Sequence, residues 1–323
     1  MRISVVMATY NGARFVREQV ESILRGSLAP DELVVADDGS SDATLEIVRS
    51  VFASTAPAGT TLVVLEGSAP LGVTANFERG LLASGGELIA LSDQDDVWHS
   101  DRLAAAVEAF RVDDALELQH ADARLVDEAG APLGASLTQA LSVRAGERAA
   151  LAAGRPFGTY IRRNLATGAT IMLRRRLVDR AVPFPPTWVH DEWLAIIAAA
   201  TGAVQFLDRE LIDYRQHGSN QIGVQVPTLR YRVRKMLEPR EDRYSLLAAR
   251  AAVLSQRLAE LDAPAEFRIL ADDKARFEAL RASLPAVRLA RLPAVVREAL
   301  KGSYGRLSSQ GALDVVRNLL QPD

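Results

Sequence analysis

The chain has 323 residues, 48% of them hydrophobic and 24% charged, which is enough for a substantial buried core in one or two domains. It contains no cysteine, which excludes disulfides, thiolate metal ligands and cysteine nucleophiles and fits a reducing compartment. The first lysine is Lys235, so the N-terminal region can hold neither a phosphate-loop lysine nor a Schiff-base lysine.

Hydropathy and charge indicate a cytoplasmic protein in two parts. No run reaches the roughly 18 apolar residues of a membrane span, and we expect no signal peptide. Residues 1–225 contain 20 basic and 29 acidic residues, whereas residues 226–323 contain 18 basic and 12 acidic residues. We therefore predict a domain over 1–225 and a helical, basic region over 226–323. Nucleic-acid binding is not favoured, because the part with recognisable chemistry is acidic.

Strands and helices are predicted to alternate in the first third of the chain. Short apolar, β-branched runs predict strands, and apolar residues at helical spacing predict the helices that follow them. The predicted strands are 3–7, 33–36, 61–65 and 88–91, and the predicted helices lie within 11–26, 45–52, 76–83 and 101–112. This alternation is typical of an α/β fold with a mostly parallel sheet covered by helices on both faces.

The pattern is less regular after residue 117, where antiparallel additions to the sheet are expected. Strands are predicted at 118–121, 123–126, 166–173, 204–207 and 211–214, and helices at 194–201, 229–237 and 245–261. Residues 133–163 give no clear pattern. Gly202 is the expected end of the helix at 194–201.

Polar motifs follow three of the predicted strands. They are Thr9-Tyr10-Asn11, Asp37-Asp38-Gly39-Ser40 and Asp93-Gln94-Asp95-Asp96. Ligands of open α/β sheets bind beyond the carboxyl ends of the strands, so these motifs are expected to meet on one rim. Carboxylates as close together as those of 93–96 repel one another unless a cation or hydrogen-bond donors hold them ionised. An acidic turn that only caps the next helix is the alternative.

These three motifs, in this order and spacing, resemble the inverting family-2 glycosyltransferases. The resemblance covers about residues 1–225 and implies the GT-A fold, a nucleotide-sugar-binding α/β domain. The segments His190-Asp191-Glu192-Trp193 and Tyr214-Arg215-Gln216-His217-Gly218-Ser219-Asn220 look like a bacterial branch whose members are described as rhamnosyltransferases for surface polysaccharides.

The resemblance implies roles for particular residues. Asp95 matches the metal-binding carboxylate, with Mg or Mn as the suited ion and His217 as a further ligand, and Asp93 is assigned to the ribose or the metal. Asp38 resembles the carboxylate that binds the base. The donor-pocket residues that complete this set are Thr9, Tyr10, Trp98 and Arg215. Packing is the alternative for Trp98, pairing with a structural carboxylate is the alternative for Arg215, and Asp96 is expected to organise the turn.

Asp191 is the candidate catalytic base, which would take the proton of an acceptor hydroxyl in a single inverting displacement. Capping of the helix that begins there is the alternative for Asp191, and Glu192 is the weaker candidate for the same role. The expected reaction moves a sugar from a dTDP-, UDP- or GDP-linked donor to a saccharide acceptor. We expect this acceptor to be linked to a lipid and the reaction to belong to cell-surface polysaccharide synthesis.

Other functions remain open at this point. A sugar-nucleotide pyrophosphorylase is less favoured, because the first loop is neither basic nor rich in glycine. A glycoside hydrolase with two carboxylates and a non-catalytic sugar-nucleotide-binding protein are further alternatives. The basic, apolar segment at 229–237 suggests a peripheral contact with the inner face of the cell membrane. A solvated helix face packed on the catalytic domain is the favoured alternative.

Overall fold

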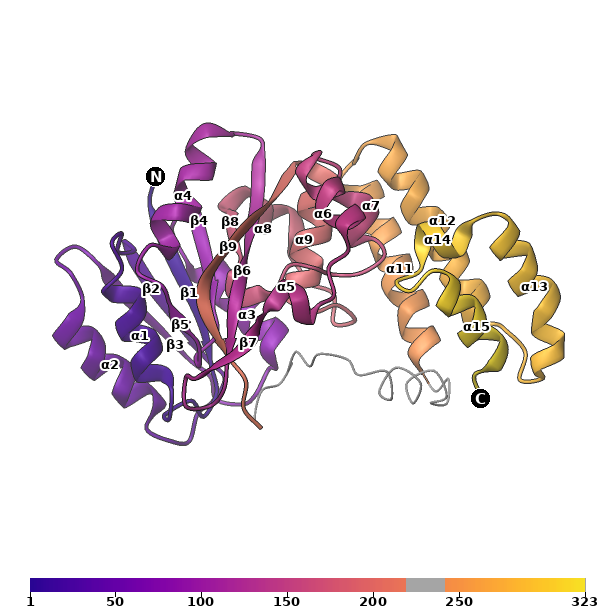
Figure 1. Ribbon diagram of the computed structural model, residues 1–323. Coiled ribbons are helices and arrows are strands. Elements are labelled where there is room, and N and C mark those ends of the chain that lie inside the picture. The colour runs from indigo at the N-terminus through magenta and orange to yellow at the C-terminus, as the bar shows by residue number, and fades with distance from the viewer. Residues whose placement is uncertain (219–241, 323) are drawn as a thin grey trace. The chain divides into compact units, whose positions relative to one another are not determined.

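The computed structural model describes residues 1–218 and 242–322, which form two compact units (Figure 1). Unit 1 comprises Met1–Gly154, Leu165–Ala198 and 202–218. Unit 2 comprises Arg155–Asn164, Ala199–Thr201 and 242–322. The boundary predicted at residue 225 and the helix predicted at 229–237 lie outside the described residues.

Unit 1 is built on one sheet that has nine strands in the described part of the chain. The strands are β1 (Ile3–Thr9), β2 (Glu32–Asp37), β3 (Thr61–Glu66), β4 (Leu88–Ser92), β5 (Val97–Trp98), β6 (Leu116–Val126), β7 (Pro132–Ser136), β8 (Met172–Arg174) and β9 (Ala203–Arg215). Their order is β3-β2-β1-β4-β8-β6-β9-β5, with β7 paired to β6.

The first four strands are parallel to one another, and the rest of the sheet is mixed. Strand β1 pairs in parallel with both β2 and β4, whereas β8 runs antiparallel to β4 and to β6. Strands β6 and β9 are again parallel. The predicted α/β architecture with antiparallel additions is therefore confirmed, and the carboxyl ends of β1, β2 and β4 share one rim.

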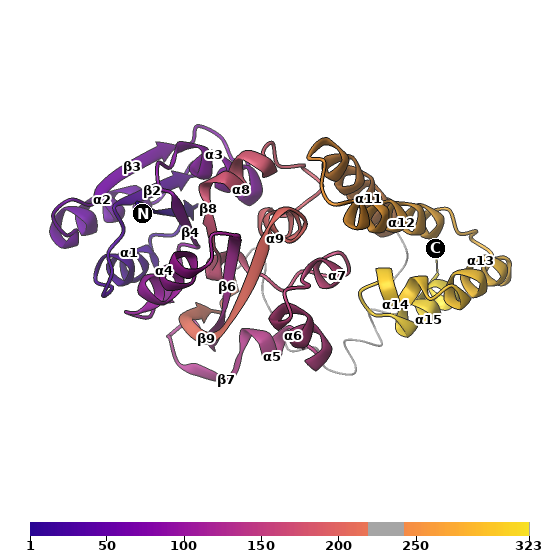
Figure 2. The same cartoon turned by 90° about the horizontal axis from the view of Figure 1, so that it is seen from above.

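Helices cover both faces of the sheet in unit 1. They are α1 (Val16–Leu24), α2 (Thr44–Thr55), α3 (Val73–Ala83), α4 (Arg102–Val112), α5 (Leu137–Ala140), α6 (Ala145–Ala152), α8 (Arg175–Ala181) and α9 (His190–Thr201), of which the last three residues belong to unit 2. Figure 2 shows α1, α2 and α4 on one side of the parallel strands and α3 and α8 on the other.

The alternation of side chains along a strand explains why both faces are covered. In β1, Val5 and Met7 enter the core cluster formed with α1, α2 and α4. Val6 points to the opposite face, where a Cβ added to Gly80 of α3 would lie 2.6 Å from its Cγ1. The middle of the strand, Val5 to Ala8, is thus apolar because each face of the sheet packs against a helix.

Several predicted elements differ from the observed ones. The two strands predicted within 118–126 are parts of the single strand β6, and those predicted at 204–207 and 211–214 are parts of the single strand β9, because bulges let each strand continue through its polar positions. The strand predicted at 166–173 is a short 3-10 helix, η1 (Gly168–Thr170), followed by β8. The helix predicted within 11–26 is α1, which begins at Val16 and ends at Leu24.

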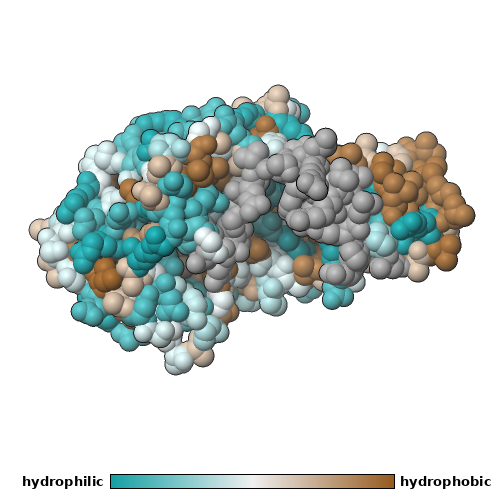
Figure 3. All heavy atoms as spheres, turned by 60° about the horizontal axis from the view of Figure 1, so that its bottom comes forward, coloured by the Kyte–Doolittle hydropathy of each residue, from teal (hydrophilic) through white to brown (hydrophobic). Residues whose placement is uncertain are grey.

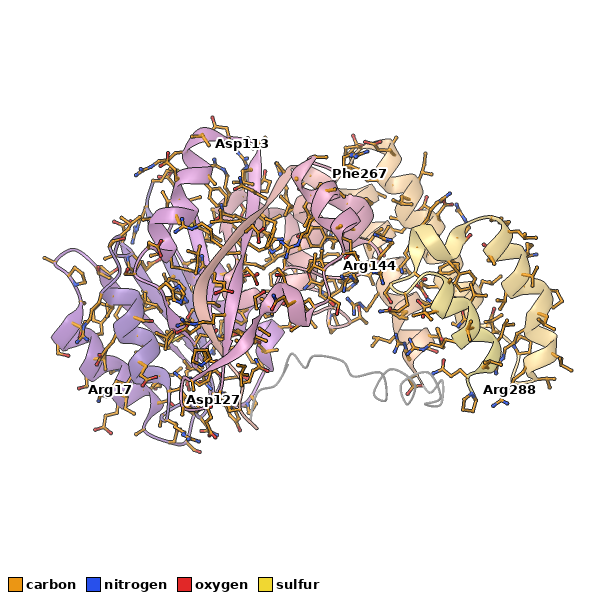
Figure 4. The ribbon with its side chains drawn as sticks, in the orientation of Figure 1. Arg17, Asp113, Asp127, Arg144, Phe267 and Arg288 are labelled. Atoms are coloured by element: carbon orange, nitrogen blue, oxygen red, sulfur yellow. The ribbon has the colours of Figure 1, made fainter. Side chains whose placement is uncertain are left out.

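Unit 2 is helical in its described residues. It contains α7 (Phe157–Tyr160), α11 (Arg243–Glu260), α12 (Ala265–Ala282), α13 (Arg288–Leu300), α14 (Ser303–Leu307) and α15 (Ala312–Leu320). Its apolar core is formed by Phe277, Leu284, Val295, Tyr304 and Leu307. Phe267, labelled in Figure 4, lies with its ring centroid 4.5 Å from that of Phe157. The predicted helical character of the C-terminal region is confirmed.

Candidate functional site

The structure brings the three strand-end motifs together on one rim of the sheet. Thr9 lies beside Asp37 in the register of β1 and β2, and β4 ends at Ser92 on the other side of β1. The Asn11 backbone N–H donates to Ser40 Oγ at 2.8 Å, which joins the first loop to the second. The loops after β1, β2 and β4, which contain the three polar motifs, therefore form one continuous surface.

Asp37 organises the loop after β2 instead of facing a ligand. Its carboxylate accepts hydrogen bonds from the Thr9 hydroxyl at 2.7 Å and from the Ser40 hydroxyl at 2.6 Å. The backbone N–H groups of Gly39 and Ser40 also donate to it. Gly39 has a φ of +86°, which a residue without a Cβ adopts readily. Thr9, predicted to bind the donor, is buried and holds Asp37.

Asp38 connects the same loop to the segment that precedes α3. Its two oxygens accept the backbone N–H groups of Leu71 at 2.7 Å and Gly72 at 2.9 Å. A carboxylate oxygen has two lone pairs, so each oxygen can accept one further hydrogen bond. The position is compatible with the predicted contact to a nucleotide base, while the observed contacts fix the shape of the pocket wall.

Gln94 joins the acidic loop to the Tyr10 loop, a role that the sequence analysis did not assign. Its Oε1 accepts the Tyr10 backbone N–H at 2.9 Å, and its Nε2 donates to the Tyr10 carbonyl at 3.1 Å. The side chain thereby imitates the pairing of a neighbouring strand. A Cβ added to Gly12 would lie 2.2 Å from Gln94 Oε1. Gly12 was therefore the signal in the sequence that another side chain, here Gln94, approaches the backbone closely at this position.

Asp95 and His217 meet although they are distant in sequence. Asp95 Oδ2 lies 2.9 Å from His217 Nε2, and their side chains are 15% and 7% exposed. The imidazole stacks on Phe15, with 4.8 Å between the ring centroids. The structure thus brings together Asp95 and His217, both predicted as metal ligands, with the imidazole packed on the ring of Phe15.

Burial and mutual repulsion alter the acidity of the other carboxyl groups in the acidic loop. Burial, followed by the charges of Asp95 and Asp191, raises the pKa of Asp93 to about 7. Burial, followed by the charges of Asp95 and Asp93, raises the pKa of Asp96 well above its ordinary value. A region in which ionised carboxylates repel one another this strongly attracts a cation.

Asp96 has the structural position that the sequence predicted. It is buried, and its Oδ1 accepts the Arg215 backbone N–H at 3.0 Å, so it connects the acidic loop to the end of β9. Its Oδ2 has no hydrogen-bond partner among the described residues. An unpartnered buried oxygen favours the neutral carboxyl group, in agreement with the raised pKa of Asp96.

Two predicted donor-binding residues have structural contacts instead. Arg215 is 4% exposed, and its guanidinium donates to Glu18 Oε2 at 2.6 Å and to the Asp95 carbonyl at 2.8 Å. It thus follows the alternative of pairing with a structural carboxylate. Trp98 is buried in the core, with the Arg102 guanidinium 4.9 Å from its ring centroid. Trp98 thus follows the packing alternative.

Asp191 lies in the first turn of α9 and close enough to the acidic loop to affect it. Its Oδ2 accepts the Gly168 backbone N–H at 3.1 Å, and its Oδ1 accepts that of Glu192 at 2.5 Å. The charge of Asp191 raises the pKa of Asp93. These contacts hold the carboxylate in one orientation beside the predicted donor site.

His190, beside Asp191, is an unusual buried residue. It is 4% exposed and stacks on Phe77 with 4.1 Å between centroids. Neither ring nitrogen has a hydrogen-bond partner among the described residues. Burial lowers its pKa to about 3, so the ring is neutral at physiological pH. The residue that precedes Asp191 in α9 is therefore buried and uncharged.

The residues of the site fit a divalent cation in part. Within 1–218 and 242–322, no three His, Asp or Glu side chains are placed so that together they could hold a metal ion. Asp95 and His217 already form a pair of an oxygen and a nitrogen ligand, and Asp93 adds negative charge beside them. A metal held by this pair would take its remaining ligands from a bound molecule or water.

Comparison with known proteins places this geometry in a class. Residues 4–145 match the family model described as Glycosyl transferase family 2. The chain is 27% identical over 230 residues to an uncharacterised glycosyltransferase of Nostoc, a match that covers 68% of this chain and 66% of that protein, just under two thirds. It is 26% identical over 232 residues to the dTDP-rhamnosyl transferase RfbG of Shigella flexneri, which covers 68% of this chain and 74% of that protein.

Solved structures share the fold. The S. aureus protein TarS (residues 1–349), crystallised with UDP-GlcNAc, aligns with a TM-score of 0.59 and 18% identity over 99% of this chain and 90% of that one. The mannosyltransferase PcManGT of Pyrobaculum calidifontis, in complex with GDP-Man and Mn2+, aligns with a TM-score of 0.52 and 18% identity over 98% of this chain and 85% of that one. The fold is therefore that of the GT-A glycosyltransferases. Residues 4–145, somewhat less than half of the chain, are thus similar to glycosyltransferase family 2.

Proposed function

We propose that the protein is a metal-dependent, inverting glycosyltransferase that moves a sugar from a nucleotide-diphosphate donor to a saccharide acceptor. The observation that carries the proposal is the placement of Asp191 beside the acidic loop that contains Asp93 and the Asp95–His217 pair. The donor would lie across the rim between the Asp38 loop and this acidic loop.

In the proposed reaction the acceptor hydroxyl oxygen attacks the anomeric carbon of the donor sugar. The bond from that carbon to the diphosphate oxygen breaks as the new glycosidic bond forms, so one displacement inverts the configuration. Asp191 takes the proton of the attacking hydroxyl, and the backbone N–H groups of Gly168 and Glu192 keep its carboxylate oriented. Mg or Mn, bound by Asp95 and His217 with Asp93 nearby, would supply charge stabilisation for the leaving diphosphate.

The substrate proposals are supported by similarity alone. The Shigella relative is a dTDP-rhamnosyl transferase, so dTDP-rhamnose is the first donor to test, followed by UDP- and GDP-sugars. We propose a lipid-linked saccharide of cell-surface polysaccharide synthesis as the acceptor. A cytoplasmic location at the inner face of the membrane fits a chain without cysteine and a lipid-linked acceptor.

Asp191→Asn tests the assignment of the base. The variant is expected to bind donor and Mn2+ as the wild type does, while transfer falls by about 100-fold or more, because the amide cannot accept the proton. Glu192→Gln is the matched control, since it changes the neighbouring acid of the same turn and should retain transfer. Full activity of Asp191→Asn would disprove the role of this residue.

A further inference from the structure

Helix α13 of unit 2 presents an apolar stripe to solvent. Its exposed large apolar residues are Leu289, Leu292, Val296 and Leu300, of which Leu289 and Leu300 are 76% and 84% exposed. With ~100° of rotation per residue, these four positions fall on one side of the helix, opposite the buried Arg291 and Val295. A helix buried on one side normally turns polar residues to solvent on the other, and α13 does not.

The neighbouring helix α15 extends the apolar surface. Its exposed large apolar residues are Leu313, Val316 and Leu320, at the same three- and four-residue spacing, while Asp314 and Asn318 are buried on its other side. In the space-filling view, hydrophobic residues gather at the end of unit 2 that contains α13 (Figure 3). We call the seven residues named on α13 and α15 the apolar face. An exposed surface of this kind indicates a binding partner.

Basic residues border the apolar face. Arg288 is the first residue of α13 (Figure 4), and Arg297 lies on the other side of the stripe at the same ~100° per residue. Lys301 and Arg306 follow and are exposed. Of the six basic residues in 285–322, these four are exposed, whereas Arg291 and Arg317 are buried. Long cationic side chains beside an apolar stripe can reach anionic headgroups while the stripe enters the acyl boundary.

We propose that the apolar face and its basic border bind the surface of an anionic lipid bilayer. Charge complementarity decides between a bilayer and a second copy of the chain, because two copies of this face would bring like charges together. No helix in the described residues is long and apolar enough to cross a membrane, so α13 would lie in the plane of the interface. The biological purpose of this membrane binding rests on the proposed function. A lipid-linked acceptor is presented at a membrane, so an enzyme that binds the bilayer would meet its acceptor there.

Vesicle flotation of the full chain tests this inference. The wild type is expected to float with vesicles of equal parts phosphatidylglycerol and phosphatidylcholine and not with pure phosphatidylcholine. Leu289→Glu combined with Leu300→Glu should weaken binding by about tenfold or more, since two exposed apolar side chains that would enter the bilayer become charged. Arg288→Gln combined with Arg297→Gln should weaken it by roughly fivefold per charge. Each replaced residue is exposed, so the folded state should persist, which a thermal melt checks.

Ile269→Glu is the matched control, because Ile269 lies on α12 of the same unit, is 61% exposed and is outside the apolar face. It should float as the wild type does. Equal flotation of all variants, no flotation of the wild type, or concentration-dependent self-association that Leu289→Glu abolishes would each overturn the inference. Donor binding measured on the same samples involves unit 1 residues, so failure of the proposed reaction and failure of membrane binding are separate results.

Discussion

His217 Nε2 lies 2.9 Å from Asp95 Oδ2, although 122 residues separate the two in the chain. The contact is possible because β5 pairs with β9, which holds the end of β9 beside the acidic loop. The contact places a carboxylate oxygen and an imidazole nitrogen side by side, so that together they can act as two ligands of a metal ion. The metal proposal depends on this pair more than on any other contact.

Removing either member of the pair should remove the effect of metal on donor binding. For Asp95→Ala and His217→Ala we expect the stabilisation of the protein by Mn2+ plus nucleoside diphosphate to fall by at least about 2 °C in melting temperature. His99→Ala is the control, because His99 and Asp213 form another His–Asp pair at 2.9 Å. Unchanged melting with and without a chelator in the Asp95 and His217 variants would contradict the metal site.

Gln94→Ala should weaken donor binding without removing the catalytic base. The substitution deletes two hydrogen bonds to the Tyr10 backbone, so the first loop is no longer held against the acidic loop. With about 1 kcal/mol for each bond, donor affinity should fall by roughly 5- to 30-fold, with a smaller change in kcat. Titration calorimetry with the donor measures the change. Gln139→Ala is the control for loss of a glutamine that also bonds to backbone, away from the rim. Equal donor affinities for Gln94→Ala and the wild type would contradict the positioning role.

Asp93→Asn should have opposite effects on the metal-free and metal-loaded protein. The pKa of Asp93 is raised from 3.8 to about 7, so ionisation costs the folded state stability as pH rises through this window. A neutral amide removes that cost and should raise the free energy of unfolding at pH 8 by about 1–3 kcal/mol, less than the full shift because the side chain is only half-buried.

The same variant should lose part of the stabilisation by Mn2+, since the negative charge that attracts the ion is gone. Urea unfolding with and without Mn2+ provides both measurements. A less stable metal-free variant at pH 8 would contradict the electrostatic account of the acidic loop.

His190→Phe should reduce the pH dependence of stability below neutrality. The pKa of His190 is lowered from 6.5 to about 3, so the unfolded chain binds a proton that the folded chain does not. Stability contributed in this way is present above pH 6.5 and is lost as pH falls toward 3, by up to about 1.4 kcal/mol per pH unit. Phenylalanine keeps the stacking on Phe77 without titrating.

Urea unfolding at several pH values between 4 and 7 measures this slope. It should be shallower in His190→Phe than in the wild type, while His217→Ala serves as a control for loss of another histidine. An identical slope in His190→Phe and the wild type would show that the residue is protonated in the folded state.

The sequence was most informative where local pattern and tertiary structure agree. The parallel strands β1 to β4 were predictable, because each has a central apolar run and the runs are separated by segments with helical spacing. The convergence of the Thr9, Asp38 and Asp95 loops followed from the topology of such sheets. The family resemblance rested on the same three motifs.

Prediction was poorer where distant segments decide. Residues 133–163 contain most of the short strand β7 and the short helices α5, α6 and α7, and their own sequence pattern is weak. The donor-binding roles of Trp98 and Arg215 could not be judged from residue type, since an aromatic ring or a guanidinium serves packing as readily as binding. Only the positions of Glu18 and the Asp95 carbonyl show how Arg215 is used.

By itself, therefore, the sequence determined the order of most strands and helices, the sites of the polar loops and the resemblance to glycosyltransferase family 2, because these depend on short-range periodicity and on motif spacing. The tertiary structure alone decided that His217 reaches Asp95, that Gln94 fastens the Tyr10 loop, and that α13 turns its apolar stripe to solvent. The physical reason is that hydrogen-bond partners and solvent exposure depend on distances between residues far apart in the chain, which local pattern does not encode.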